Sequence, residues 1–442
     1  MRLPPEERAG YLDHATQGNA ELLRRVAALL RSYSAGEFLE QAASSDLRDN
    51  MAMSIPFTEK VGDRISRYKL LQQIGEGGCG VVYMAEQEEP VRRRVALKII
   101  KLGMDTKTVI ARFEAERQAL AMMDHPNIAK VFDAGATETG RPYFVMELVR
   151  GIRITDYCDE QKLSTRGRLD LFIQVCQAIQ HAHQKGIIHR DIKPSNILVT
   201  INDGVAVPKV IDFGIAKATS GQQLTDKTVF TAFEQFIGTP AYMSPEQAVL
   251  TSLDIDTRSD IYALGVLLYE LLTGKTPFDA KELLAIGLDE LRRTIRDKEP
   301  DRPSTRLSAL GGSELSTTAQ HRGLDALKLV SELRGDLDWI VMKALEKDRA
   351  RRYETASGFA ADIQRHLNNE PVAACPPSRL YRFQKMARRN KLAFAAGMSV
   401  AAALVIGLGV STWMFIEQRA ALKRAVAAEL EQTRLRQVAE AN

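Results

Sequence analysis

Three polar side chains that together could catalyse phosphoryl transfer lie in the stretch Gly186–Asn196, GIIHRDIKPSN. Asp191 can accept a hydroxyl proton, Lys193 supplies a fixed positive charge, and the amide oxygen of Asn196 can bind a hard cation. Because Pro194 disfavours a helix interior, the stretch predicts a loop. Transfer of a phosphoryl group from a nucleotide requires such a set of groups. A polar surface loop is the simpler alternative, but it does not explain this order.

The composition limits the size class, the partners and the redox compartment of the chain. Its 442 residues, 45% of them hydrophobic, suffice for two or three domains or for one large catalytic domain with appendages. The formal net charge of +4, from 60 basic and 56 acidic residues, is too balanced to indicate nucleic-acid binding. The four cysteines, Cys79, Cys158, Cys176 and Cys375, show no CxxC spacing, which favours free thiols in a reducing, cytosolic compartment.

A glycine-rich turn precedes this loop in the chain. Gly75, Gly77 and Gly80 give GxGxxG, a weak signal alone because Rossmann units begin with the same triplet. Here the glycines lead into the alternating runs VVYMAEQ and VALKII and not into a helix, which predicts a hairpin over phosphates. Glycine suits such a hairpin because the backbone can approach the phosphates without an intervening Cβ atom.

The order HRDxKxxN, together with this turn, resembles the eukaryotic-type (Hanks-type) protein kinases, and the Lys two places after the Asp is typical of the serine/threonine class. The resemblance covers about residues 68–367. The phrases VIARFEAERQAL and GTPAYMSPEQA are similar to those of membrane-anchored bacterial kinases. The resemblance implies an α+β, bilobal kinase fold: a mostly antiparallel five-stranded lobe with one helix, a larger helical lobe, and ATP between them.

Lys98 lies among apolar residues on a strand-like run, where a lone ammonium is costly unless it has a partner. The helical pattern ARFEAERQALAMMDHPNI offers Glu114 and Glu116 as that partner. Glu116 is preferred because it lies ten places before Pro126, as in kinases, and puts Leu120 one turn further along the same face. Glu114 is then a solvated helix charge.

The DFG element of these kinases is matched at residues 212–214, at the end of a predicted strand. A carboxylate is needed there because Mg²⁺ takes oxygen ligands and bridges nucleotide phosphates. The residues that follow show little periodicity and close at GTPAYMSPE, residues 238–246, which resembles the end of an activation segment.

The resemblance implies a role for individual residues. Asp191 would accept the hydroxyl proton, Lys193 would neutralise the moving phosphoryl group, and Lys98, held by Glu116, would contact the nucleotide phosphates. Asn196 and Asp212 would hold Mg²⁺, with Mn²⁺ as an alternative. The residues implied in ATP binding are Gly75, Glu76, Gly77, Gly78, Gly80, Val82, Ala96, Lys98, Glu116, Met146 as gatekeeper, Glu147 and Val149. Structural roles are implied for Thr239 beside the catalytic loop, Glu246 paired with Arg352, and Asp260 below the loop.

The segment between the DFG element and GTP carries three threonines, Thr225, Thr228 and Thr231, which we expect as autophosphorylation sites. Arg190 supplies a cation that such a phosphate can pair with. Three threonines in a polar loop, without a regulatory role, are the simpler interpretation.

Several stretches outside these motifs carry predictions of their own. Apolar spacing predicts a helix over 164–185, at whose end His181 and His183 lie on different faces, so core or surface histidines are favoured over metal ligands. Residues 281–334 are more polar than a minimal kinase requires and predict a surface insertion, partly ordered. Residues 1–43 predict a helical segment, and 44–67 a linker.

An uncharged run over residues 392–416 is long enough to cross a bilayer as one helix. The segment 368–391 before it is basic, with six Lys or Arg and no acid from Arg379 to Lys391, which places the kinase domain in the cytoplasm of a single-pass inner-membrane protein. A small-residue stripe at Ser399, Ala403, Gly407 and Ser411 is consistent with a homodimer. Residues 417–442 predict a helical tail, either a short stalk or the start of a further domain.

The sequence therefore predicts a membrane-anchored kinase that transfers the γ-phosphoryl group of ATP to serine or threonine hydroxyls of proteins. One alternative is a pseudokinase scaffold that binds nucleotide, but such proteins usually lack one of three charged groups that Lys98, Asp191 and Asp212 supply here. A second alternative is a small-molecule or lipid kinase of related fold, but those seldom keep GTPAYMSPE and HRDIKPSN together.

Overall fold

The computed structural model describes residues 59–77, 80–100, 122–213, 240–248, 255–285, 287–376 and 378–440. The chain divides into two compact units, Met1–Asp63 and Arg64–Asn442, and every element described below belongs to the second. Several sequence predictions lie outside the described residues: the N-terminal helices, Gly78, Glu116, Thr225, Thr228, Thr231 and Thr239.

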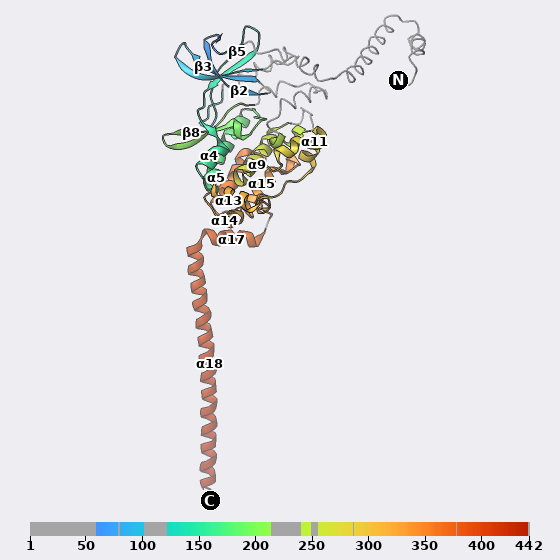
Figure 1. Cartoon of the computed structure of the whole chain (residues 1–442). Coiled ribbons are helices and arrows are strands. Elements are labelled where there is room, and N and C mark those ends of the chain that lie inside the picture. Colours follow the sequence, from blue (N-terminus) through green and yellow to red (C-terminus); the bar gives the residue numbers. More distant parts are fainter. Residues whose placement is uncertain are drawn as a thin grey trace, which may run out of the picture. The chain divides into compact units, whose positions relative to one another are not determined.

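An antiparallel sheet forms the N-terminal lobe (Figure 1). Its strand order is β1-β2-β3-β4-β6-β5, with bounds β1 (Arg64–Ile65), β2 (Tyr68–Gly77), β3 (Gly80–Gln87), β4 (Arg93–Ile100), β5 (Val131–Ala136) and β6 (Pro142–Glu147). The prediction of five strands was one short, because β1 lies in the stretch predicted as a linker. Ile65 is 6% exposed and pairs with Tyr68, so apolar burial adds this strand to the sheet edge.

The C-terminal lobe is built around two long helices, α5 (Thr165–Gln184) and α9 (Thr257–Thr273). The helix predicted over 164–185 is confirmed; the Ser164 hydroxyl accepts a hydrogen bond from the Gly167 N–H, which caps its N-terminus. A three-stranded sheet lies in this lobe, formed by β7 (Ile152–Arg153), β8 (Ile197–Asn202) and β9 (Val205–Val210). The other helices, apart from those described below, are α4 (Ile154–Glu160), η2 (Pro194–Asn196), η3 (Pro240–Tyr242), α8 (Pro245–Ala248), α15 (Asp336–Ala344), η5 (Arg349–Arg351) and α16 (Ala356–Leu367).

The segment predicted as a surface insertion is folded into the lobe. It forms α10 (Ala280–Ala285), α11 (Leu288–Asp297), α12 (Pro303–Ser308), α13 (Gly312–Gln320) and α14 (Ala326–Leu333). The prediction of a surface insertion was wrong because the many charged and polar residues of the segment masked its buried apolar side chains. Four of these, Leu307, Ala319, Leu329 and Leu333, belong to the same buried cluster as the apolar residues of α9.

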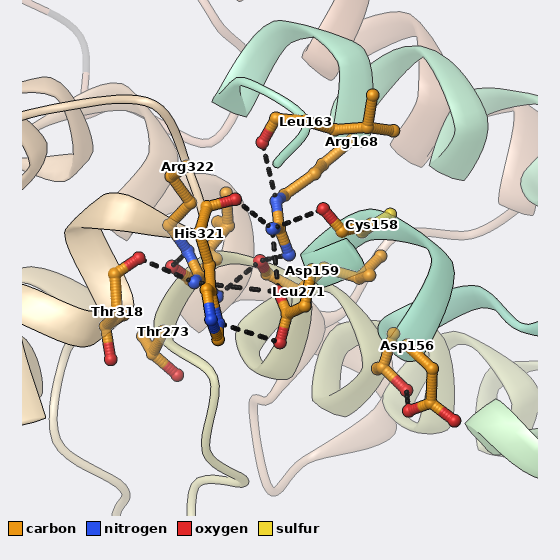
Figure 2. Close-up of polar contacts among 12 residues, drawn as sticks. Asp156, Cys158, Asp159, Leu163, Arg168, Leu271, Thr273, Thr318, His321 and Arg322 are labelled. Carbon is orange, nitrogen blue, oxygen red and sulfur yellow. Dashed lines mark hydrogen bonds and ion pairs between the residues drawn. The ribbon is translucent and has the colours of Figure 1, made fainter. Parts of the chain in front are cut away.

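Two buried arginines hold this segment against α5 and α9 (Figure 2). Arg168 donates to the carbonyl of His321 at 2.8 Å and to the carboxylate of Asp159 at 2.7 Å. Arg322 donates to the carbonyl of Leu271 at 2.9 Å, which Arg168 also reaches at 3.2 Å. Burial, and then the charge of Arg168, lowers the pKa of Arg322 to about 10, so its guanidinium stays charged at neutral pH.

The C-terminal part of the described chain consists of two helices, α17 (Arg379–Arg389) and α18 (Lys391–Glu440) (Figure 1). α18 contains the whole uncharged run 392–416 and continues through most of the stretch predicted as a separate tail, so run and tail form one helix. Among the described residues, Phe394–Arg436 is the one span long and apolar enough to cross a membrane, and its side chains are exposed.

Candidate active site

The strand register brings four of the predicted ATP-binding residues to one face of the N-terminal sheet. Val82 pairs with Lys98 between β3 and β4, and Ala96 pairs with Met146 between β4 and β6. Because Ala96 and Lys98 are two apart on one strand, and paired residues share a face, all four side chains lie on the same side of the sheet. Ala96 and Met146 are buried, and Val82 packs against the same apolar cluster. The sheet thus presents a cation beside an apolar patch, as an adenine nucleotide requires.

The glycine-rich turn joins β2 and β3, with Gly77 paired to Gly80. Gly80 has φ +155°, and a Cβ atom there would lie 2.1 Å from the carbonyl oxygen of Ile99 on β4. The glycine is therefore required because the hairpin lies close against β4, and not only because of the phosphates. At Gly77 none of the described atoms lies within 4 Å of a Cβ position, so among these atoms no close contact requires a glycine.

Lys98 and Asp212 join the two lobes. The Lys98 ammonium lies 2.8 Å from Oδ1 of Asp212, and both side chains are largely shielded from solvent. Glu116, the predicted partner of Lys98, lies outside the described residues. The N–H of Ile211 donates to the carbonyl of Asn196 at 2.9 Å, so the two predicted metal ligands, Asn196 and Asp212, are held close in space although they are sixteen residues apart.

The three residues of the opening motif contact one another. The ammonium of Lys193 lies 2.9 Å from Oδ2 of Asp191, and the side-chain amide of Asn196 donates to the same oxygen at 3.1 Å and to the Asp191 carbonyl at 2.8 Å. These contacts fix the orientation of the Asp191 carboxylate. They also turn the amide nitrogen of Asn196 towards Asp191, so its amide oxygen faces elsewhere and is the atom that can bind a cation.

Asp260 supports the loop from below, as the resemblance implied. It is 1% exposed, and its carboxylate accepts the N–H of His189 and the N–H of Arg190, both at 2.8 Å. Arg190 has φ +63°, a left-handed conformation that is unfavourable for a residue with a long side chain. The two hydrogen bonds to Asp260, and one from Gln247 Nε2 to the Arg190 carbonyl at 3.1 Å, hold it there.

Two histidines that the sequence interpretation left without a role also position the site. His183 contacts Asp260 through Nε2 at 2.7 Å, so this residue is part of the loop support. His189 is fully buried and packs on Phe213 of the DFG element, with ring centroids 4.6 Å apart. Burial lowers the pKa of His189, so its ring is neutral: Nε2 donates to the Ile211 carbonyl at 3.1 Å, and Nδ1 accepts the Asp191 N–H at 3.3 Å. His189 thus joins the loop to the segment after β9 that carries the predicted metal ligand Asp212. Its signal in the sequence was its place before Arg190 and Asp191.

The end of the predicted activation segment is fastened to the C-terminal lobe. Arg352 and Glu246 form the predicted ion pair through two hydrogen bonds, at 2.7 and 2.8 Å, and Arg352 is 3% exposed. The Ser259 hydroxyl donates to Glu246 at 2.7 Å. Although burial opposes it, this pairing lowers the pKa of Glu246.

Glu147 and Val149, two of the residues implied in ATP binding, lie at the end of β6 and just after it. The Glu147 N–H donates to the Lys130 carbonyl at 2.8 Å, and its carboxylate accepts from Lys209 at 3.0 Å. A hydrogen bond from this residue to a nucleotide base would therefore use the Glu147 carbonyl. Val149 is half-buried and lies in the non-helical, non-strand segment after β6.

A family model described as the protein kinase domain matches residues 68–361. The chain belongs to the protein kinase family. Among curated kinases, PknB of Mycobacterium tuberculosis is 37% identical over 316 residues, which cover 70% of this chain and 44% of PknB. PrkC of Bacillus subtilis is 37% identical over 310 residues, which cover 69% of this chain and 41% of PrkC. This kinase chain therefore spans less than half the length of these relatives. The solved kinase domain of M. tuberculosis PknI matches 70% of this kinase chain at 23% identity, with a TM-score of 0.48.

Proposed function

We propose that this chain is a membrane-anchored serine/threonine protein kinase that uses ATP and Mg²⁺. The observation that carries the proposal is the convergence of Lys98, Asp212 and Asn196 around a catalytic loop whose Asp191 is held in one orientation. The curated relatives, which are named serine/threonine-protein kinases, support the residue class of the acceptor. A pseudokinase scaffold usually lacks one of three charged groups, but this sequence has all three, Lys98, Asp191 and Asp212.

The donor set of the site fits a hard divalent cation. Asn196 and Asp212 offer amide and carboxylate oxygens, and Mg²⁺ prefers such ligands over nitrogen or sulfur. When bound, the metal would neutralise charge on the nucleotide phosphates. Lys98 would then orient the phosphates from the sheet face, with Val82, Ala96 and Met146 enclosing the base. In this proposal the cation selectivity comes from the oxygen ligands, and Mn²⁺ would substitute.

Asp191 would bind the acceptor hydroxyl and take its proton as the bond to phosphorus forms. A positioned general base contributes about 10²- to 10⁴-fold to a rate. Lys193, already beside Asp191, would oppose the negative charge that develops on the transferred group. Most of the remaining acceleration would come from positioning, because the loop conformation is set by Asp260 before substrate arrives.

We also propose that autophosphorylation of Thr225, Thr228 or Thr231 activates the enzyme, with the phosphate pairing with Arg190. The support is that the Arg190 backbone is fixed by Asp260 and Gln247, so its side chain starts from a defined point near the loop. Phosphopeptide mapping of active enzyme tests it: no phosphate between residues 216 and 237 would rule this switch out.

The membrane anchor is proposed for residues 392–416 of α18, with the kinase domain in the bacterial cytoplasm. The support is the exposed apolar surface of that helix and the excess of basic residues before it. Dimerisation through the Ser399–Ser411 stripe is a further part of the proposal, supported by the small residues alone.

The decisive experiment uses the full chain in detergent with labelled ATP, Mg²⁺ and a generic basic protein. Asp191→Asn should reduce transfer by at least ~10²-fold, while nucleotide affinity stays within a factor of ~3, because the base acts in the transfer step and not in ATP binding. Asp203→Asn, in the exposed turn between β8 and β9, is the matched control and should leave the rate unchanged. Equal transfer by Asp191→Asn and the natural chain would refute the assignment.

A further inference from the structure

The basic segment before α18 is not a simple tether, because part of it is bound to the kinase lobe. Asp362, fully buried in α16, accepts the N–H groups of Ala373 and Ala374 at 2.6 and 2.9 Å. Val372 is 4% exposed and belongs to the large apolar cluster of the lobe. The chain therefore stays attached to the lobe up to the start of α17, which the Ser378 hydroxyl caps.

One face of α17 is clamped to the lobe through Asp336. The hydroxyl of Tyr381 donates to Oδ1 of Asp336 at 2.9 Å, and the ammonium of Lys385 pairs with Oδ2. His366 contacts Oδ2 at 3.0 Å, and the Tyr381 ring packs edge-on against Trp339 at 5.7 Å. Tyr381 and Lys385 are four residues apart and so lie on the same helix face. Lys385 is only 7% exposed, which is rare for lysine and marks a fixed contact.

The opposite face of α17 is apolar and uncovered. Leu380 is 66% exposed and Phe383 is 52% exposed, and with Ala387 they follow the spacing i, i+3, i+7 that lines one side of a helix. Met386, 45% exposed, widens this stripe. Exposed basic residues flank it: Arg379, Arg382, Arg388 and Arg389. A helix with this division of apolar and basic side chains is suited to the surface of a membrane that contains anionic lipids.

The position of this face in the chain favours lipid over a second protein copy. Only Asn390 separates α17 from α18 (Figure 1). The rings of Phe383 and Phe394 contact each other, with centroids 5.3 Å apart. The apolar stripe therefore continues directly into the first turn of the proposed membrane helix. Two copies of α17 placed face to face would bring together basic residues with no acid in Arg379–Lys391 to compensate them.

We propose that α17 lies in the headgroup layer of the cytoplasmic leaflet, with Leu380, Phe383 and Met386 inserted and its arginines on anionic phospholipid headgroups, while the Asp336 clamp fixes the kinase lobe to it. The kinase domain would then meet the membrane in one orientation. This inference rests on the proposed membrane anchoring by α18 and adds the surface helix and its lipid specificity.

The test places the full chain in nanodiscs of phosphatidylcholine with or without phosphatidylglycerol, with acyl chains brominated to quench tryptophan. The variant Phe383→Trp is made together with Trp413→Phe. The other native tryptophan, Trp339, stays in every variant, so the signal of Trp413→Phe alone is subtracted and the difference reports on α17. We expect its fluorescence to fall at least ~2-fold more in the anionic discs, and high salt to reverse the difference. Val91→Trp in the same Trp413→Phe background is the matched control: Val91 is 66% exposed in the N-terminal lobe, and its fluorescence should be insensitive to lipid.

A second pair of variants tests the charges and the apolar stripe separately. Replacing Arg379, Arg382, Arg388 and Arg389 by Gln should remove the dependence on phosphatidylglycerol, and Leu380→Ser should weaken quenching in both kinds of disc. These side chains are exposed, so transfer activity in detergent should be unchanged and should confirm folding.

The fluorescence difference between the natural chain and Trp413→Phe isolates the signal of Trp413, and this signal separates failure of this inference from failure of the anchor. Trp413 quenched in both kinds of disc, with no quenching in Phe383→Trp, would overturn the surface helix and leave the anchor intact. Trp413 unquenched would overturn the anchor and the inference together. Two chains per disc with an unquenched Phe383→Trp would assign the face to a second copy and would also overturn the proposal.

Discussion

Asp260 and Asp336 are both buried carboxylates that collect hydrogen-bond donors from distant parts of the chain, but they bind different kinds of donor. Asp260 takes two backbone N–H groups of the catalytic loop, besides His183. Asp336 takes the side chains of Tyr381, Lys385 and His366.

The difference follows from what each carboxylate holds in place. The catalytic loop has N–H groups that no helix or strand uses, so a carboxylate can fix its backbone directly, including the left-handed Arg190. The N–H groups of α17 beyond its first turn are bonded within the helix, and only side chains can dock it. A backbone-binding carboxylate therefore sets a conformation, whereas a side-chain-binding carboxylate sets a docking contact that can be released without changing the helix.

The largest expected effect comes from Asp260→Asn, which would break the loop support. One carboxylate oxygen becomes an NH₂ group facing an N–H donor, so the strained Arg190 loses an anchor. We expect transfer to fall by about 10²-fold through misplacement of Asp191. The free energy of unfolding should fall by about 3 kcal/mol, as when one partner of a buried charged contact is removed.

Steady-state kinetics and urea unfolding measure the two effects of Asp260→Asn. Asp325→Asn is the control, because the Asp325 side chain is 76% exposed and pairs only with an exposed Lys328 among the contacts seen. A normal rate for Asp260→Asn would mean that the loop holds its shape without the carboxylate.

Glu270 is a third buried carboxylate, and its surroundings raise its pKa, whereas those of Asp336 lower the pKa. Burial, and then the charges of Asp156 and Asp159, raises the pKa of Glu270 to about 7. A raised folded-state pKa gives stability that is complete below the ordinary value of 4.5 and is lost as the pH rises through about 7. Glu270→Gln should therefore stabilise the fold at pH 8, by up to about 3 kcal/mol, and should give no gain at pH 4.5. Equal effects at both pH values, in denaturant unfolding, would contradict the shift.

Asp336→Asn should release α17 and leave catalysis nearly unchanged, which is the contrast with Asp260. Loss of the charge leaves Lys385 buried without its counter-ion, at a cost of about 2 kcal/mol. We expect hydrogen exchange of residues 379–389 to accelerate by at least ~10-fold, with transfer to the generic basic protein within a factor of ~2. A fall in transfer as large as that of Asp260→Asn would show that the two clusters are coupled.

The docking of α17 should also respond to acid. Burial opposes ionisation, but His366, Lys385 and Tyr381 lower the pKa of Asp336 to about 2. A lowered pKa gives stability that is present above the ordinary value of 3.8 and is lost as the pH falls through about 2. Exchange protection of α17 should therefore be complete at pH 5.

Tyr381→Phe should have the smallest effect, since it removes one hydroxyl and keeps the ring against Trp339. The hydroxyl donates to Asp336 and accepts the Val372 N–H at 3.2 Å, so the loss should be about 1 kcal/mol of docking free energy. In the Asp336→Asn background the same change should cost less, because the two residues share a contact. If the two substitutions reduce the exchange protection of α17 additively, Tyr381 and Asp336 stabilise the docking independently, which would contradict the prediction.

Motif residues and regular elements could be predicted because their signals are local. Alternation identified β3 and β4, and apolar spacing identified α5. The Glu246–Arg352 pair and the contact of Asp260 with the loop were predicted from the resemblance to kinases, because the kinase motifs occur here in the expected order. The predicted roles of Asp191, Lys193 and Asn196 in catalysis stay predictions, although the structure brings them into contact.

The parts that could not be predicted depend on partners far away in the sequence. The residues around Ile65 show no strand pattern, so its pairing in the sheet could not be predicted. In residues 281–334 the many polar and charged residues masked the apolar side chains that reach the core. Gly80 was predicted for phosphate access, but its contact with Ile99 depends on how β4 lies against the hairpin.

The sequence by itself determined the family, the residue types predicted for catalysis and the apolar run of α18, because each depends on residue order and spacing. Only the tertiary structure decided that His183 and His189 support the loop, that Lys98 meets Asp212, and that α17 is docked through Asp336. The physical reason is that a buried carboxylate or ammonium is stable only beside its partners, and the fold alone determines which distant residues become those partners.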